Sequence, residues 1–251
     1  MQLFSERSFP AFIAVVLCAM LAAPAYAGII DHSGSAQPNT TEGWDLATYY
    51  GASNAYPVTN DRGEDAWGVE KTSASSELVY AYNMSSAEID QVQSLGWSVQ
   101  VRLRVVDASD NPDYAVSVHF GVGSTRYDMA FGSSGNNPVV MLVSSFTGNG
   151  VNPSGTTYTV DDADGGYHDY RLVYDAIAGG ADLYVDGVKR ISNYAGMANA
   201  PGVANVFFGS AGNDGTGRAN FNRVSVAVPE PASASILLLS AASLLRRNRR
   251  R

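Results

Sequence analysis

The chain has few of the residues that thiol or metal chemistry requires. Of its 251 residues only Cys18 is a cysteine, and His32, His119 and His168 are the three histidines. Cys18 lies in an N-terminal segment that we expect to be removed, so the mature chain has no disulfide and no thiolate ligand. Without a His-Glu-x-x-His motif, a zinc peptidase or a Ser/His/Asp hydrolase has no recognisable scaffold. The stability of the chain must therefore come from a hydrophobic core.

Positive charge is also scarce in the central part of the chain. Sixteen Lys and Arg stand against 24 Asp and Glu, a formal net charge of −8. Arg7 and five arginines near the C-terminus supply six of the positive charges, and Glu6 and Glu230 two of the negative ones, which leaves the central residues at about −12. Nucleic acid is not expected as a partner, because phosphate binding needs a cationic surface.

The N-terminal residues 1–27 have the order of a secretory signal peptide. Arg7 precedes an apolar run over residues 11–22, and Ala25-Tyr26-Ala27 is a small-x-small cleavage site. This order predicts export through the inner membrane and removal of the segment.

The C-terminal residues 227–251 combine a short motif, an apolar run and an arginine cluster. Val228-Pro229-Glu230-Pro231 precedes the apolar run 232–245, and five arginines follow. The run is shorter than the roughly 20 residues that span a bilayer comfortably, so it predicts a marginal transmembrane segment and transient membrane contact. The order resembles the PEP-CTERM sorting signal, and the resemblance implies that an exosortase-type peptidase processes the tail and leaves the protein at the cell surface or in the matrix. An ordinary single-pass anchor is the alternative.

Residues 28–226 alternate in the way that β-strands do. Trp97–Val106 places Trp97, Val99, Val101, Leu103 and Val105 on one face. Similar alternation is found in Tyr114–Val122 and Thr125–Gly132, and we expect a loop over Phe146–Thr157. A single short surface helix, Ser86–Ser94, is predicted from the capping-box spacing of Ser85 and Glu88 and from Gly96. Many short strands with turns between them predict an all-β, two-sheet antiparallel jelly-roll sandwich.

The stretch Tyr167–Arg190, YHDYRLVYDAIAGGADLYVDGVKR, predicts two antiparallel strands and the start of a third. Asp186-Gly187 favours a type I′ hairpin turn, because both positions of that turn need φ > 0. The stretch resembles the C-terminal signature of laminin-G-like, concanavalin A-like domains. The resemblance implies a concanavalin A-like sandwich in which an early strand pairs with the last, and such sandwiches serve as lectins, adhesion modules, glycosidases or spacers.

Five basic side chains are predicted on strand faces opposite the core, with Asp128 and Asp169 among them. They are Arg102, Arg104, His119, Arg126 and Arg171. If their strands are neighbours, they form a locally basic surface that would bind an anionic polysaccharide. The alternative is that long charged side chains only cover the outer face, in Arg–Asp cross-strand pairs.

Two acidic loops are candidate calcium sites, although no cofactor is required by the sequence. The first cluster contains Asp107, Asp110 and Asp113, and the second contains Asp161, Asp162 and Asp164. Calcium takes six to eight oxygen ligands, and laminin-G-like relatives often carry it on rim loops. Asp and Asn also dominate ordinary turns, so a purely structural role stays open.

No catalytic motif is recognisable. Glu88-Ile89-Asp90 is the nearest approach to the carboxylate motif of laminarinase-like glycosidases, but Gln93 stands where the second Glu should be. Tyrosines in loop-like stretches, namely Tyr49, Tyr50, Tyr56 and Tyr194, are possible sugar platforms. We therefore expect an exported, non-catalytic carbohydrate-binding protein, the alternatives being a glycoside hydrolase or lyase and a purely structural matrix protein.

Overall fold

The computed structural model describes residues 26–73, 75–108, 115–147, 152–162, 164–200, 202–210 and 215–230. The elements are β1 (Tyr26–Ser33), α2 (Pro38–Thr41), β2 (Asp45–Tyr50), β3 (Ser53–Asp61), β4 (Glu64–Lys71), β5 (Glu77–Asn83), α3 (Ser86–Leu95), β6 (Trp97–Ala108), β7 (Val116–Val122), β8 (Thr125–Ser134), β9 (Asn137–Thr147), β10 (Asn152–Thr159), β11 (His168–Asp175), β12 (Gly180–Val185), β13 (Val188–Tyr194), β14 (Met197–Ala198), β15 (Asn205–Ser210) and β16 (Gly217–Pro229).

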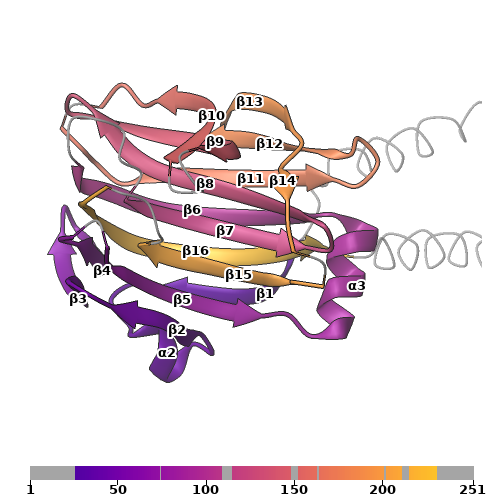
Figure 1. Cartoon of the computed structure of the whole chain (residues 1–251), viewed down its shortest axis with the longest axis horizontal. Helices are drawn as coiled ribbons and strands as arrows, with labels where there is room; N and C mark the ends of the chain where they lie inside the picture. The colour runs from indigo at the N-terminus through magenta and orange to yellow at the C-terminus, as the bar shows by residue number, and fades with distance from the viewer. Residues whose placement is uncertain are drawn as a thin grey trace, which may run out of the picture. The chain divides into compact units, whose positions relative to one another are not determined.

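The strands form two antiparallel sheets, as the sequence predicted (Figure 1). Sheet A has the order β13-β12-β11-β6-β16-β4-β3, with β1 paired to β16. Sheet B has the order β10-β9-β8-β7-β15-β5-β2, with β14 paired to β8. The two sheets belong to one compact unit, Gly28–Val228. The fold is a jelly-roll sandwich, and the implied pairing of an early strand with the last is confirmed by β1 and β4 beside β16.

Aromatic side chains from both sheets meet in the core between them. The ring centroids of Trp97 on β6 and Phe120 on β7 are 4.5 Å apart. Phe131 on β8 lies 5.0 Å from Tyr170 on β11 in an edge-to-face arrangement. Such pairs add about 0.5–1.5 kcal/mol each beyond their buried area. The inner faces of both sheets are therefore occupied by packing, which leaves the outer faces and the rims for function.

Predictions that rested on local signals are confirmed. The inward residues of Trp97–Val106 as far as Leu103 are buried in β6. The capping box of α3 is formed, because Glu88 N donates to Ser85 Oγ at 3.4 Å and Ser85 N donates to Glu88 Oε2 at 2.7 Å. Asp186 and Gly187 have φ values of 50° and 78°, as the type I′ turn between β12 and β13 requires.

The loop predicted over Phe146–Thr157 is wrong. β9 continues to Thr147, and β10 pairs with it from Asn152 to Thr159. β10 is an edge strand whose mostly small polar residues carry no apolar alternation, so its backbone pairing with β9 is the main contact that places it in the sheet, and Tyr158 packs against the core. A bulge lies between Ser154 and Gly155, and a Cβ at Gly155 would be 1.9 Å from the Leu142 carbonyl oxygen. Only glycine fits this close approach of two backbones.

The expected signal peptide and apolar tail segment lie outside the described residues. Within the described part of the chain, no helix is both long and apolar enough to cross a bilayer. Of the predicted sorting motif, Val228 is buried at 2% exposure at the end of β16, Glu230 follows Pro229, and Pro231 is not described.

Candidate functional site

The five basic residues predicted to share one surface divide between the two sheets. Arg102 and Arg104 on β6 and Arg171 on β11 lie on the outer face of sheet A. His119 on β7 and Arg126 on β8 lie on the outer face of sheet B. The prediction of a single basic surface is therefore wrong, although each residue is on an outer face. Alternation along a strand determines the face of a residue but not the sheet that the strand joins.

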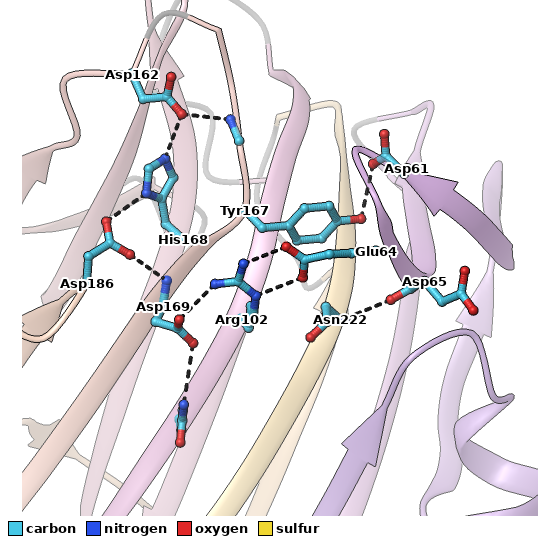
Figure 2. Close-up of polar contacts among 12 residues, drawn as sticks. Asp61, Glu64, Asp65, Arg102, Asp162, Tyr167, His168, Asp169, Asp186 and Asn222 are labelled. Atoms are coloured by element: carbon cyan, nitrogen blue, oxygen red, sulfur yellow. Dashed lines mark hydrogen bonds and ion pairs between the residues drawn. The ribbon is translucent and has the colours of Figure 1, made fainter.

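On sheet A, Arg102 joins three strands through two carboxylates (Figure 2). Its Nε and Nη2 donate to the two carboxylate oxygens of Glu64 on β4 at 2.8 and 2.5 Å. Its Nη1 donates to Asp169 Oδ2 on β11 at 2.7 Å. The hydrogen bond to Glu64 is the main reason that the pKa of Arg102 is raised. The guanidinium is permanently charged, and its bidentate pairing fixes its orientation.

Asp61, at the end of β3, is the second centre on this face. Its carboxylate accepts hydrogen bonds from Arg104 Nη1 at 2.7 and 3.0 Å, from Tyr167 Oη at 3.0 Å and from Asn220 Nδ2 at 2.7 Å. Burial raises the pKa of Asp61, but the hydrogen bonds from Asn220, Arg104 and Tyr167 outweigh it, so the pKa lies below its ordinary value. Arg104 Nε also donates to the Gly165 carbonyl at 2.7 Å, which ties the loop before β11 to the sheet.

At the rim of sheet A, His168 lies between two carboxylates (Figure 2). Its Nε2 is 3.0 Å from Asp162 Oδ2, and its Nδ1 is 2.8 Å from Asp186 Oδ2. Hydrogen bonds from the Gly166 backbone and from His168 lower the pKa of Asp162 despite some burial. These contacts hold the loop before β11 and the β12–β13 turn together.

The charged groups around Arg102, Asp61 and His168 on sheet A are thus paired with one another, although Arg218 Nε and Asn220 Oδ1 on β16 are buried without a hydrogen-bond partner. Figure 2 labels the acidic residues of this face, which are Asp61, Glu64, Asp65, Asp162, Asp169 and Asp186. Arg102 is paired with Glu64 and Asp169, and Arg104 is paired with Asp61. This part of the face is not basic, and its arrangement corresponds to the alternative of Arg–Asp cross-strand pairs. Arg171 is different, because it is exposed and lies with its guanidinium carbon 5.2 Å from the centre of the Tyr184 ring.

On sheet B, His119, Asp128 and Arg126 form a compact cluster. His119 and Asp128 are cross-strand partners, and His119 Nδ1 is 2.7 Å from Asp128 Oδ1. Arg126 Nη2 donates to Asp128 Oδ2 at 2.6 Å. His119 and Asp128 are only 4% and 5% exposed, although they lie on the outer face. Phe207 on β15 accounts for part of this burial, because its ring stacks on His119 at 4.3 Å.

Several buried polar atoms of this cluster have no hydrogen-bond partner. They include Arg126 Nε, Asp128 Oδ1 and Asn205 Oδ1. The contact of Asp128 Oδ1 with His119 has the distance of an ion pair but not the angle of a hydrogen bond. Buried polar atoms are nearly always hydrogen-bonded in native proteins, so these atoms leave hydrogen-bonding capacity for water or for a polar ligand.

Gly121 leaves room for this cluster. A Cβ at Gly121 would be 2.8 Å from Asn199 Nδ2, 2.9 Å from His119 Nε2 and 3.2 Å from Asn205 Oδ1. Polar groups from β7, from β15 and from the connection between β14 and β15 therefore converge over one glycine. Beside them, Phe146 is 37% exposed, and the Arg126 guanidinium carbon lies 5.0 Å from the centre of its ring. We call His119, Arg126, Asp128, Phe146, Asn199, Asn205 and Phe207 the sheet B cluster.

The structure describes most of the second predicted calcium loop but only the first residue of the cluster in the first loop. Asp107 is exposed at the end of β6, and Asp110 and Asp113 lie outside the described residues. In the second loop, both oxygens of Asp162 accept backbone N–H groups, from Asp164 at 3.2 Å and Gly166 at 2.7 Å, so this carboxylate acts as a turn residue. Asp161 and Asp164 are exposed. Within the described ranges, no three His, Cys, Asp or Glu side chains gather in a way that could hold a metal. Calcium in the first loop stays a prediction.

Sequence reasoning missed Phe146, Phe207, Asn199 and Asn205. Phe146 was assigned to a loop, and no local pattern indicated that the strand containing Phe207 pairs with β7. Of the predicted tyrosine platforms, Tyr194 is buried at 8% exposure and donates a hydrogen bond to the Val143 carbonyl. Tyr56 is half-buried, and its ring lies against Gly68. Only the register between strands could have revealed the cluster.

The fold is a lectin-like jelly roll, and polar side chains converge on the outer face of its sheet B. The family model described as the Vibrio cholerae sialidase lectin insertion matches residues 58–236, which is most of the chain. The chain therefore belongs to this lectin-insertion family.

Solved structures support the fold. The carbohydrate esterase vb_24B_21 of the Shiga toxin-encoding bacteriophage phi24B has a TM-score of 0.58 at 14% identity, over 82% of this chain and 100% of that one. A botulinum neurotoxin DC binding domain solved with SialylT has a TM-score of 0.50 at 10% identity, over 86% of this chain and 51% of that one. The chain thus spans about half of the neurotoxin domain. No curated protein sequence matches the chain.

Proposed function

We propose that the domain is a non-catalytic carbohydrate-binding module and that the sheet B cluster is its glycan-binding surface. The observation that carries this assignment is the set of unpaired buried polar atoms beside an exposed phenylalanine and a partly exposed arginine. Ligand sites combine apolar side chains with a few placed polar groups. A sugar offers hydroxyl groups that both donate and accept, and an apolar ring face that packs on an aromatic side chain.

The contrast with sheet A supports this choice. Arg102 and Arg104 are held by carboxylates and would have to break those contacts to bind a ligand. Arg126 is also paired with a carboxylate, that of Asp128, but its buried Nε has no hydrogen-bond partner. The lectin-insertion match and the neurotoxin domain solved with SialylT support a carbohydrate partner in general. Acidic exopolysaccharide is a candidate, because Arg126 would supply a charge-assisted hydrogen bond.

We also propose that the protein is exported and sorted through its C-terminal tail. The signal-peptide pattern of residues 1–27 and the order of Val228-Pro229-Glu230-Pro231, apolar run and arginines support this proposal. Val228 is part of the core, so cutting by an exosortase-type peptidase after this residue leaves the sandwich intact. The protein would then reside at the cell surface or in the matrix after transient membrane contact.

A glycan array with the purified Gly28–Val228 unit tests the binding proposal. Arg126→Met is expected to weaken binding of the retained glycan by roughly tenfold to a hundredfold, because a hydrogen bond to a charged group contributes about 1.5–3 kcal/mol. Phe146→Ala should also weaken binding, because it removes the aromatic ring against which a sugar would pack. Arg171→Met is the matched control, since Arg171 also lies over an aromatic ring but on sheet A.

The outcomes separate the alternatives. Equal loss in all three variants would contradict the assignment to sheet B. Release of shorter sugars from the retained glycan would indicate a glycoside hydrolase or lyase. An array without any retention would favour a structural matrix protein.

A further inference from the structure

Ile177 is the most exposed large apolar side chain of the described residues, at 99% exposure. It lies in the loop between β11 and β12, between two exposed alanines. Asp175 Oδ1 accepts hydrogen bonds from Ile177 N at 2.8 Å and Ala178 N at 3.2 Å, and Gly179 N donates to the Asp175 carbonyl at 2.9 Å. The loop is therefore a capped turn that presents the isoleucine to its surroundings.

A second apolar side chain lies at the same rim. Leu95, the last residue of α3, is 37% exposed. A Cβ on the next residue, Gly96, would be 2.6 Å from the Tyr174 carbonyl oxygen, so the end of α3 packs against the end of β11. Leu95 and Ile177 thus belong to one end of the sandwich, where α3 is drawn in Figure 1.

The chain leaves the sandwich at this same end. Tyr174 on β11 is the partner of Trp97 on β6, and Ala227 on β16 is the partner of Ser98. Val228 is therefore about two strand spacings, or about 10 Å, from Tyr174. Four residues later the apolar run begins at Ala232, a reach of at most about 14 Å for an extended chain. The start of the run cannot be far from this rim.

We propose that this rim is a membrane-facing surface, with Ile177 and Leu95 entering the interfacial layer of a lipid bilayer. The inference rests on the proposed membrane residence of the tail. An apolar run of 14 residues is a marginal anchor, and stable attachment usually takes a second contact. Asp90 and Asp175 are exposed near this rim, and the last turn of α3 has no basic residue. Anionic lipid attracts basic residues, so these groups would not favour it, and we take a zwitterionic bilayer as the partner.

Single-cysteine labelling can test this surface, because the only cysteine, Cys18, is in the removed segment. Ile177→Cys in the chain Gly28–Arg251 would carry an environment-sensitive fluorophore. Val188→Cys is the matched control, since Val188 is also apolar and exposed, at 50%, but lies at the opposite end of β12. Both proteins are reconstituted into phosphatidylcholine vesicles, floated, and quenched with brominated lipid or with iodide.

We expect brominated lipid to quench the label at residue 177 several-fold more than the label at residue 188, with iodide showing the reverse order. Flotation with equal iodide quenching at both sites would overturn the membrane-facing rim and leave the tail anchor standing. A label at residue 177 shielded from both quenchers would indicate a protein partner and would also overturn the proposal. Failure of both proteins to float would refute the anchor and the rim together.

Discussion

Replacing Arg102 with methionine tests whether the polar network of sheet A is structural. Methionine keeps the apolar stem but removes the guanidinium, which holds Glu64 on β4 and Asp169 on β11 against β6. The three side chains are 29%, 25% and 39% exposed, so water compensates part of the loss. Fully exposed ion pairs contribute up to about 1 kcal/mol, and hydrogen bonds to charged groups about 1.5–3 kcal/mol.

From these values we expect Arg102→Met to lower the free energy of unfolding by about 2 kcal/mol, with a fall in Tm of about 4–8 °C for a domain of this size. Urea unfolding followed by tryptophan fluorescence is a suitable assay. Trp44, Trp67 and Trp97, the three tryptophans of the chain, are 2%, 5% and 1% exposed and would all report the loss of the core.

Arg223→Met provides the control for this measurement. Arg223 has an ion pair with Asp31 at 3.0 Å, and both side chains are about half exposed, at 47% and 49%. We expect a change within about 0.5 kcal/mol. If Arg102→Met changed stability no more than Arg223→Met, the network would not be structural.

Glycan binding should be retained in Arg102→Met, and a loss of binding in a folded variant would contradict the division between the sheets.

Three further predictions concern pH, backbone packing and calcium. The pKa of Asp61 is lowered in the folded chain, so its stabilisation is present above the ordinary carboxyl pKa of 3.8 and is lost as the pH falls through the lowered pKa. Asp61→Asn should therefore show a flatter dependence of the free energy of unfolding on pH in acid, and parallel curves for the two proteins would contradict this. Gly155→Ala should lower the free energy of unfolding in urea by about 2–4 kcal/mol, because the added Cβ meets the Leu142 carbonyl. Gly28→Ala is the control and should leave this free energy unchanged, because a Cβ there meets nothing within 4 Å. An unchanged free energy of unfolding in Gly155→Ala would refute the close approach. If the loop after Asp107 binds calcium, millimolar calcium should raise the Tm of the protein. This rise should persist in Asp162→Asn, because both oxygens of Asp162 accept hydrogen bonds within its own turn. An unchanged Tm in the parent protein would exclude calcium binding at this loop.

Structural features that depend only on residues close together along the chain could be predicted from the sequence. The alternation of Trp97–Val106, the capping box of α3 and the Asp186-Gly187 turn each involve neighbours along the chain, and all three are found. The faces of Arg102 and Arg126 could be predicted for the same reason.

The order of strands could not be predicted, because pairing of distant strands has no local signature. Only the structure places β15 beside β7 and thus Phe207 on His119. β10 escaped prediction because an edge strand of small polar residues has the composition of a loop. The sheet B cluster depends on both features, since it needs the register of β15 and the extension of β9 to Phe146.

The positions of the last two strands bear on when the domain can fold. β16 lies between β6 and β4 in sheet A, and β15 lies between β7 and β5 in sheet B. Until β15 and β16 have been synthesised, each sheet therefore consists of two separate groups of strands, even if the earlier strands have already paired with one another. Folding dominated by such distant pairings is slow. A growing chain would stay incomplete until its C-terminal strands emerge, so a polypeptide threaded through a membrane would assemble the sheet B cluster, the proposed glycan-binding surface, only on the far side.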